Sequence, residues 1–233
     1  MQYYKKESKL LVAVDCIIFG FNGESIDILL IKRGFEPEIG KWSLMGGFVQ
    51  PDESPELSAA RVLKDLTGIE HVFMDQCGVF GNPARETEER VISIVYYALV
   101  DKQKYQNNPN DQYESQWFAL KEIPNLIFDH HDMIDQAIRE LQTKAALYPI
   151  LFKLLPEKFT IPQIAIIYEN VYQITFDKRN FSRKLNASGI LIKLNEKDKE
   201  NSKRGAFYYR INKDLYKEKI MSFIRHLPSW TID

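Results

Sequence analysis

The chain has 233 residues, of which 45% are hydrophobic and 27% charged, values typical of a globular protein with one or two domains. Its longest apolar stretches, 10–19 and 91–100, fall well short of the roughly 20 residues that a membrane-spanning helix needs, and its first residues lack a signal-peptide core. The two cysteines, Cys16 and Cys77, show no paired spacing, which argues against a disulfide or a cysteine-based metal site. We therefore expect a cytoplasmic protein that does not associate with a membrane.

Charge is distributed unevenly along the chain. Residues 1–144 carry 15 Lys and Arg against 23 Asp and Glu, a net charge of −8, whereas residues 145–233 carry 16 against 9, a net charge of +7. A basic segment of this kind favours a polyanionic partner. We predict two domains, 1–144 and 145–233, the second of which contacts the polyanion.

Apolar patterning predicts the elements of the first domain. Strands are expected at 10–19, 26–32, 71–80 and 91–100, with an edge strand near Trp117. Apolar residues at helical spacing predict a helix from Asp129 to about Lys144. Asp129 is interpreted as the N-cap of this helix, and the neighbouring histidines are interpreted as part of its first turn rather than as metal ligands.

The stretch from Trp42 to Ile69 predicts a strand, a Gly-Gly turn, a loop and a helix. Ser54 suits the N-cap of this helix, and Pro55 suits its first position, where a missing N–H costs no hydrogen bond. Gly68 suits the C-terminal end, where a left-handed residue is favoured.

The spacing of this stretch resembles the Nudix box of pyrophosphate hydrolases. Six residues fall in register with the box: Gly47, Glu53, Arg61, Leu63, Gly68 and Ile69. The three glutamate positions of the box instead hold Val62, Asp65 and Leu66, which share one helix face. Mg²⁺ prefers carboxylate oxygens, so this face offers at most one good ligand.

We therefore expect no metal site and no catalytic residues, and interpret Glu53 and Arg61 as an ion pair that holds the loop on its helix. The alternative is a working Nudix hydrolase that cleaves a nucleoside diphosphate derivative, with Mg²⁺ held by Asp65 and Glu53.

Several residues are candidates for binding a small molecule in a pocket of this domain. They are Arg33 after the second strand, Phe48 beside the Gly-Gly turn, Arg85 and Arg90 in the loop GNPARETEER, and His130. A guanidinium offers forked donors for hydroxyl or phosphate oxygens. The competing interpretation is a solvated strand end and an exposed loop.

The second domain begins with a capping box, in which Thr160 caps a helix and Gln163 bonds back to it. A second helix is expected after Thr175 and ends before Gly189. Strands at 190–194 and 206–211 then form a hairpin with a charged tip. Two helices joined by a short turn and followed by a basic hairpin are typical of a winged helix-turn-helix.

The second helix of this domain places polar and apolar residues on opposite sides. The predicted DNA contacts are Lys178, Arg179, Ser182, Arg183 and Lys184 on this helix, and Lys203 and Arg204 at the hairpin tip. A small interaction domain with a solvated basic face is the alternative. A last helix is expected around 215–224.

Both halves together resemble the Nudix-related transcriptional regulators of the NrtR type. The specific segments are GKWSLMGGFV, FGNPAR, FDH, LLPEKFTIPQIAIIYENV and DKRNFSRK. The resemblance implies an α/β (α+β) Nudix sandwich with a C-terminal winged helix-turn-helix domain. It also implies a homodimer that binds palindromic double-stranded operator DNA under the control of a small-molecule effector, with no cofactor.

Members of this family sense ADP-ribose or a related nucleotide, and some branches sense sugars such as L-arabinose. Because the box lacks the carboxylates that hold metal at a pyrophosphate, we expect a plain sugar as the first candidate effector and a role in sugar metabolism.

Overall fold

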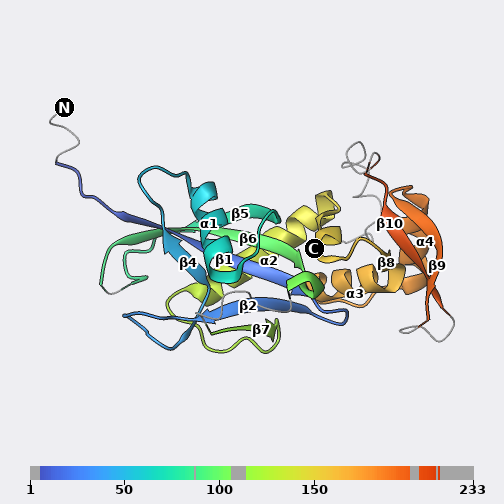
Figure 1. Ribbon diagram of the computed structural model, residues 1–233, viewed down its shortest axis with the longest axis horizontal. Helices are drawn as coiled ribbons and strands as arrows, with labels where there is room; N and C mark the ends of the chain where they lie inside the picture. Colours follow the sequence, from blue (N-terminus) through green and yellow to red (C-terminus); the bar gives the residue numbers. More distant parts are fainter. Residues whose placement is uncertain (1–5, 87, 106–113, 200–204, 214, 216–233) are drawn as a thin grey trace, which may run out of the picture. The chain divides into compact units, whose positions relative to one another are not determined.

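The computed structural model of this protein describes residues 6–86, 88–105, 114–199, 205–213 and 215 (Figure 1). The chain divides into two compact units. Unit 1 comprises Met1–Ile18, Ile28–Ala98 and Asn107–Ala137, and unit 2 comprises Phe19–Asp27, Leu99–Gln106 and Ile138–Asp233. The domain boundary expected after residue 144 stays a prediction, because the longest segment of unit 2 begins inside a helix.

The N-terminal half of the chain forms one mixed sheet. Its strands are β1 (Leu11–Phe21), β2 (Ile26–Lys32), β3 (Trp42–Ser43), β4 (Met45–Phe48), β5 (Phe73–Phe80), β6 (Val91–Asp101) and β7 (Ser115–Ala119). The strand order is β3-β2-β1-β6-β5, with β4 paired to β1 and β7 paired to β2. The apolar runs that predicted these strands are buried, as Ile17, Ile18 and Tyr97 illustrate with no exposed surface. A single 3₁₀ turn, η1 (Lys102–Tyr105), follows β6.

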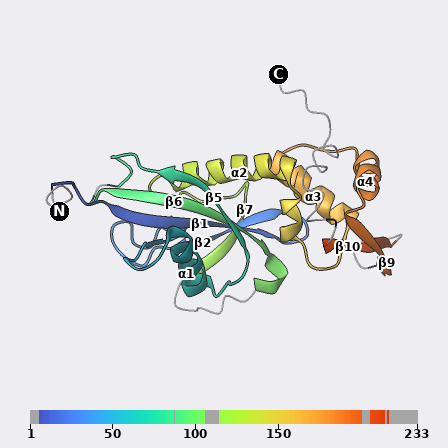
Figure 2. The same ribbon diagram turned by 90° about the horizontal axis from the view of Figure 1, so that it is seen from above.

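Two helices cover this sheet. Figure 2 shows α1 (Pro55–Thr67) and the first turns of α2 (His130–Leu147) on opposite faces of the strands. The ends of α1 are as predicted: the Ser54 hydroxyl accepts a hydrogen bond from the Leu57 amide, and Gly68 adopts a left-handed φ of 69°. Ala59, Val62 and Leu63 of this helix are buried.

In unit 2, a helix pair and a small sheet form the C-terminal part of the chain. The elements are η2 (Ile150–Leu154), β8 (Phe159–Thr160), α3 (Ile161–Tyr172), α4 (Lys178–Ala187), β9 (Leu191–Asp198) and β10 (Ala206–Ile211). The strand order is β8-β10-β9. The predicted capping box at the start of α3 is present, with the Thr160 amide donating to Gln163 Oε1 over 2.7 Å. The region of the last expected helix, 215–224, lies almost entirely outside the described residues.

The packing of α3 against α4 depends on aromatic side chains. Tyr168 of α3 lies 5.5 Å from the ring of Phe181 and 6.4 Å from that of Phe176. All three residues are buried. These contacts fix one side of α4 against α3, so the opposite side of α4 is left for solvent or a ligand. In the described part of the chain, no helix is long and apolar enough to pass through a lipid bilayer.

Candidate effector pocket and DNA-binding surface

Unit 1 contains a pocket of about 280 Å³ between the ends of β1, β2 and β4 and the start of α2. Its lining includes Ala13, Asp15, Ile31, Lys32, Arg33, Gly34, Phe35, Ser43, Leu44, Gly46, Gly47, Phe48, Leu66, Glu86, Phe128 and His130. Strand register explains why these residues meet. β4 runs antiparallel to β1, so Gly46 lies opposite Asp15 and Gly47 opposite Val14. The Gly-Gly turn thus forms one wall of the pocket beside the carboxylate of Asp15.

Aromatic rings and a cation lie on another side of the pocket. The Arg33 guanidinium lies 4.0 Å from the centre of the Phe35 ring and 5.4 Å from that of Phe128. Its Nε donates a hydrogen bond to the Phe35 carbonyl. Partial burial lowers the pKa of Arg33 against the opposing effect of nearby carboxylates, but an arginine stays charged at neutral pH. Such an arrangement can hold an anionic group next to a flat ring.

A buried ion cluster lies beside the pocket. Arg85 is 7% exposed, and its Nε and Nη2 donate to the two oxygens of Asp129 over 3.0 and 2.8 Å. Its Nη1 donates to Glu86 over 2.8 Å, and Asp15 lies 3.9 Å away. Burial alone would lower the pKa of Arg85, but Asp129, Asp15 and Glu86 outweigh it, so the pKa is raised. Burial raises the pKa of Glu86 despite the charge of Arg85.

His130, the first residue of α2, is held in a defined protonation state. The amide of Leu44 donates a hydrogen bond to His130 Nδ1 over 3.1 Å, so the ring hydrogen is on Nε2. Burial lowers the pKa of His130, and the nearby carboxylates of Asp15 and Asp129 only partly offset this effect. The imidazole is therefore neutral at neutral pH, with Nε2–H as a donor.

The α1 face that would carry metal ligands in a Nudix hydrolase does not fit Mg²⁺. Val62 is buried against Gly47, and Leu66 lines the pocket. Asp65 is largely exposed and lies 4.0 Å from Arg61. Among the residues that the structure describes, no group of three or more His, Cys, Asp or Glu side chains is placed to hold a metal ion.

Glu53 and Arg61 form the ion pair expected from the sequence. Arg61 donates to both carboxylate oxygens of Glu53, over 3.0 and 2.6 Å, and also to the Phe48 carbonyl. The hydrogen bond from Arg61 lowers the pKa of Glu53 to about 2. Arg61 thereby ties both the loop after β4 and the pocket wall at Phe48 to α1.

In the C-terminal part, α4 presents a basic surface. Asp177 caps this helix by accepting hydrogen bonds from the amides of Arg179 and Asn180. Phe181 and Leu185 are buried, whereas Arg179 and Arg183 are exposed. Arg183 donates to the Asn180 side chain over 2.9 Å. The second helix of the pair thus carries the exposed guanidinium groups that base edges and phosphates require.

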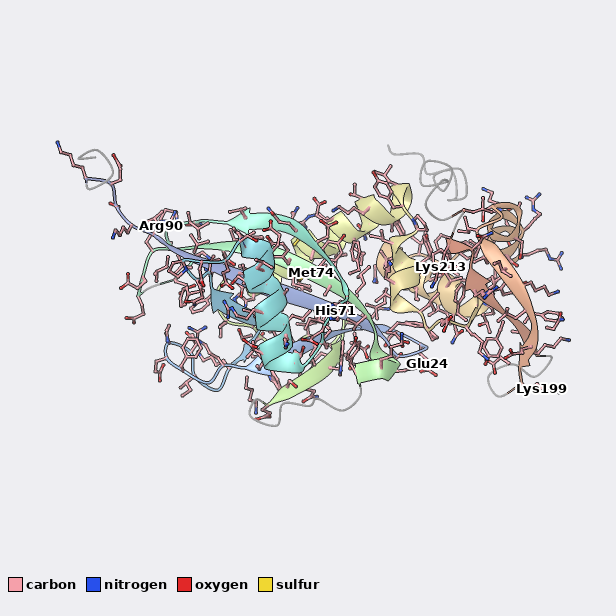
Figure 3. The ribbon with its side chains drawn as sticks, turned by 45° about the horizontal axis from the view of Figure 1, so that its top comes forward. Glu24, His71, Met74, Arg90, Lys199 and Lys213 are labelled. Carbon is pink, nitrogen blue, oxygen red and sulfur yellow. The ribbon has the colours of Figure 1, made fainter. Side chains whose placement is uncertain are left out.

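The hairpin β9–β10 extends this basic surface. Lys193 and Lys197 of β9 are both exposed, and their ammonium groups lie 3.6 and 4.5 Å from the centre of the Phe207 ring. Because both ammonium groups lie over the same ring, the two cations project together, although the register of the hairpin shifts between them. Lys199 follows at the end of β9, at the tip of the hairpin (Figure 3).

Comparisons with known proteins match both halves of the chain. Residues 9–141 match the model of the NUDIX domain family, and residues 151–211 match that of the NrtR DNA-binding winged helix domain. The ADPR responsive transcriptional repressor NtrR of Acinetobacter baylyi is 30% identical over 97% of this chain and 93% of its own length. The chain belongs to the NrtR family of Nudix-related transcriptional regulators.

Two solved structures of the Shewanella oneidensis NrtR extend this finding. The protein in complex with a 27mer DNA is 28% identical, with a TM-score of 0.77, and the match covers 88% of this chain and 95% of that chain. Its NUDIX domain in complex with ADP ribose is 28% identical, with a TM-score of 0.51, over 59% of this chain and 92% of that chain. The predicted fold class, a Nudix sandwich with a C-terminal winged helix, is confirmed.

The residues predicted for the NrtR-family pocket have different locations. Arg33, Phe48 and His130 line the pocket, as does Gly47 of the box. Arg85 lies behind the lining, where it binds Asp129. Arg90 is not among the lining residues: it donates to the carbonyls of Val91 and Gly81, near the start of β1 (Figure 3). Arg90 is thus placed to stabilise its own loop.

Two further pocket residues were not predicted from the sequence. Asp15 interrupts the apolar strand β1 and is only 6% exposed, and Glu86 follows Arg85 directly. A carboxylate in an otherwise apolar strand was the available signal for Asp15, because a buried charge needs a partner. Asp129 was interpreted as a helix cap, and its bidentate contact with Arg85 was missed.

The structure places the α4 candidates on one helix but leaves the hairpin tip undefined. Lys178 and Arg179 are exposed, as is Arg183, while Ser182 and Lys184 are half-buried. Lys178 lies 3.9 Å from Glu169 of α3. Lys203 and Arg204 lie outside the described residues. Lys193 is an additional candidate that the sequence did not indicate, and it lies beside Lys197, a lysine of the predicted charged tip.

Proposed function

We propose that this protein is a transcriptional repressor that binds operator DNA through its winged helix. A nucleotide-sugar of the ADP-ribose class fills the pocket of the Nudix-like domain and either weakens or strengthens that binding. The observation that carries this proposal is the pairing, on one chain, of an exposed basic α4 with a Nudix pocket whose metal-binding face holds Val62 and Leu66. A pocket that binds without cleaving suits a sensor.

The choice of ADP-ribose rests on the relatives. One relative is named as ADPR responsive, and the NUDIX domain of another was crystallised with ADP ribose. The pocket supports this choice with Lys32 and Arg33 for phosphate and with Phe35 and Phe128 for a flat ring. The plain sugar expected from the altered box has no support from these relatives, because loss of the metal ligands argues against hydrolysis without selecting an effector.

A free pentose, the first candidate from the sequence, becomes the second candidate effector and is retained for one structural reason. Asp15, Glu86 and His130 line the pocket with polar groups suited to hydroxyls, and a volume of about 280 Å³ lies at the small end of the range of roughly 300–1,000 Å³ for ligand pockets. The two candidates differ in charge and size, so direct titration separates them.

The deciding experiment combines operator selection with effector titration. Random duplexes are selected on the purified protein, and the enriched sequence is used in gel shifts with ADP-ribose, NAD, L-arabinose or D-ribose. An effector must bind one state of the protein more tightly than the other, so a true effector changes the midpoint of operator binding. We expect this change with ADP-ribose. If the selection enriches no sequence, operator binding is contradicted. If none of the compounds changes the midpoint, the sensor role is contradicted.

The alternative function, hydrolysis of a nucleoside diphosphate derivative, gives a direct prediction. We expect no turnover of ADP-ribose above the protein-free rate, with or without Mg²⁺ or Mn²⁺, because the α1 face lacks two of the three carboxylates that hold metal. The measurement is AMP release followed by chromatography. Metal-dependent release that is lost in Asp65→Asn would assign the protein to the hydrolases instead.

A second prediction concerns the hairpin. Replacing Lys193 and Lys197 together by alanine is expected to weaken binding to specific and random duplexes by similar factors, because phosphate contacts carry no sequence information. The slope of log affinity against log salt should fall by about one for each lost contact per bound subunit. Gel shifts at a series of salt concentrations measure both effects, and an unchanged slope would place the hairpin away from the DNA.

Assembly is the remaining part of the proposal. We infer from the family resemblance that the protein binds a palindromic operator as a homodimer. Light scattering of the free protein and of its operator complex tests this inference, with two chains expected per operator.

A further inference from the structure

The polar end of the pocket contains an unusual arrangement of buried groups. Asp15 is 6% exposed and lines the pocket. Its Oδ2 accepts a hydrogen bond of 2.6 Å from the hydroxyl of Ser93, a residue with no exposed surface. Within the described part of the chain, the other oxygen, Oδ1, accepts no hydrogen bond. Because Asp15 lines the pocket, a ligand or water there can donate the hydrogen bond that Oδ1 lacks.

The surroundings of Asp15 Oδ1 are shaped to leave that oxygen accessible. Gly46 lies directly opposite Asp15 in the β1–β4 ladder, and a Cβ atom at this glycine would come within 2.5 Å of Oδ1. Any larger residue would therefore displace the carboxylate or cover it. Gly46 also lines the pocket.

A hydrogen-bond donor faces the same point. His130 Nε2 lies 3.8 Å from Asp15 Oδ1, which is too far for a direct hydrogen bond. Because the Leu44 amide donates to Nδ1, Nε2 carries the hydrogen of the neutral ring. One oxygen atom can lie within hydrogen-bonding distance of both groups, accepting from His130 and donating to Asp15. A hydroxyl group has this combination of acceptor and donor, and a phosphate oxygen does not.

The charged side chains of the pocket indicate how a ligand is oriented in it. The two carboxylates that line the pocket, Asp15 and Glu86, disfavour a phosphate beside them, whereas Arg33 at the end of β2 favours one. The neighbouring Lys32 is already paired with Glu114 over 2.6 Å. A ligand with a phosphate and a sugar ring would therefore place the phosphate toward Arg33 and the ring toward Asp15. Adenine could supply a donor and an acceptor as well, so the test must separate the two ends of a nucleotide.

We propose that Asp15 and His130 recognise a ring hydroxyl of the effector, which for ADP-ribose is a hydroxyl of the terminal ribose, and that Gly46 keeps the Asp15 oxygen open to it. This inference rests on the proposed function. It makes Asp15 the specificity-determining residue of the pocket, with Ser93 as a positioning residue that holds the carboxylate through Oδ2. The pocket then distinguishes ADP-ribose from ADP, which has the same phosphates but no terminal ribose.

The experiment is calorimetric titration of the full-length protein with ADP-ribose and with ADP. For the unaltered protein we expect ADP-ribose to bind at least tenfold more tightly than ADP. In Asp15→Asn, an amide donor replaces the carboxylate acceptor, and loss of a hydrogen bond to a charged group should lower the affinity for ADP-ribose by roughly 10- to 100-fold. The affinity for ADP should stay within about twofold. Asp52→Asn, an exposed position in the loop before α1, is the matched control and should change neither affinity.

The outcomes separate this assignment from the function on which it rests. Equal losses for ADP and ADP-ribose in Asp15→Asn would place the adenosine end beside Asp15 and overturn the assignment. Equal binding of the two nucleotides to the unaltered protein would overturn it without any variant, so it stays testable even if Asp15→Asn does not fold. Heat with L-arabinose or D-ribose but not with ADP-ribose would overturn the assignment of the hydroxyl to a terminal ribose. If none of the four compounds (ADP-ribose, ADP, L-arabinose and D-ribose) produces heat, the proposed effector role itself is overturned.

Discussion

Replacing both Arg179 and Arg183 by alanine is expected to abolish the preference of this protein for its operator. Both side chains are exposed on the solvent side of α4, while Phe181 and Leu185 hold the other side of the helix in the core. A guanidinium that forms two hydrogen bonds with a guanine contributes about 1–3 kcal/mol to discrimination between bases. Loss of two such groups should lower operator affinity roughly a hundredfold or more.

The comparison of specific and random DNA decides how this loss arises. If the arginines contact base edges, affinity for random duplexes falls much less than affinity for the operator. The matched control is Lys9→Ala with Lys121→Ala, which removes the same charge from exposed positions outside the winged helix. Unchanged operator affinity in the double arginine variant would mean that α4 is not the recognition helix. A similar loss of operator affinity in the lysine variant would mean that the effect of the arginine changes comes from overall charge and not from contacts with bases.

The elements that could be predicted from the sequence are those determined by local chemistry. Ser54, Pro55 and Gly68 define the ends of α1, and Thr160 with Gln163 defines the start of α3, because caps depend on residues a few positions apart. The apolar runs of β1 and β6 are long enough to indicate buried strands. The polar side of α4 follows from 100° steps along one helix. In each case the signal and the structure lie within one short segment.

The polar end of the pocket could not be predicted in this way. Asp15 and Ser93 are 78 positions apart, and Arg85 and Asp129 are 44 apart, so their contacts exist only after the strands have paired. Arg85 and Arg90 are equivalent by local pattern, both being arginines of one polar loop. The fold buries the first against Asp129 and leaves the second bonded to its own loop. Sequence patterns found the loop but could not assign a role to each arginine.

Replacing Arg85 by methionine is expected to cause the largest loss of stability of any single change considered for this protein. Methionine keeps an unbranched side chain about as long as the aliphatic part of arginine, and it removes the charge and all the donors. Removing one partner of a buried ion pair typically costs about 3–5 kcal/mol, because the opposite charge is left without compensation. Asp129 would lose two hydrogen bonds, Glu86 would lose one, and Asp15 would lose a neighbouring positive charge. Urea unfolding at pH 7 measures the difference.

The pH dependence of Arg85→Met distinguishes this electrostatic cause from a simple packing defect. Burial already raises the pKa of Glu86, and without the guanidinium of Arg85 this pKa rises further above its value in the unfolded chain. A group whose pKa is raised on folding stabilises the folded state at low pH and loses this contribution as pH increases through the folded pKa. The stability deficit of Arg85→Met should therefore be largest near pH 8 and smaller near pH 5. Addition of Asp129→Asn should recover part of the loss at pH 8, since it removes one uncompensated charge. A stability deficit that is independent of pH and is unaffected by Asp129→Asn would instead assign Arg85 a packing role. The carboxylates around the pocket would then not depend on Arg85 for their charge.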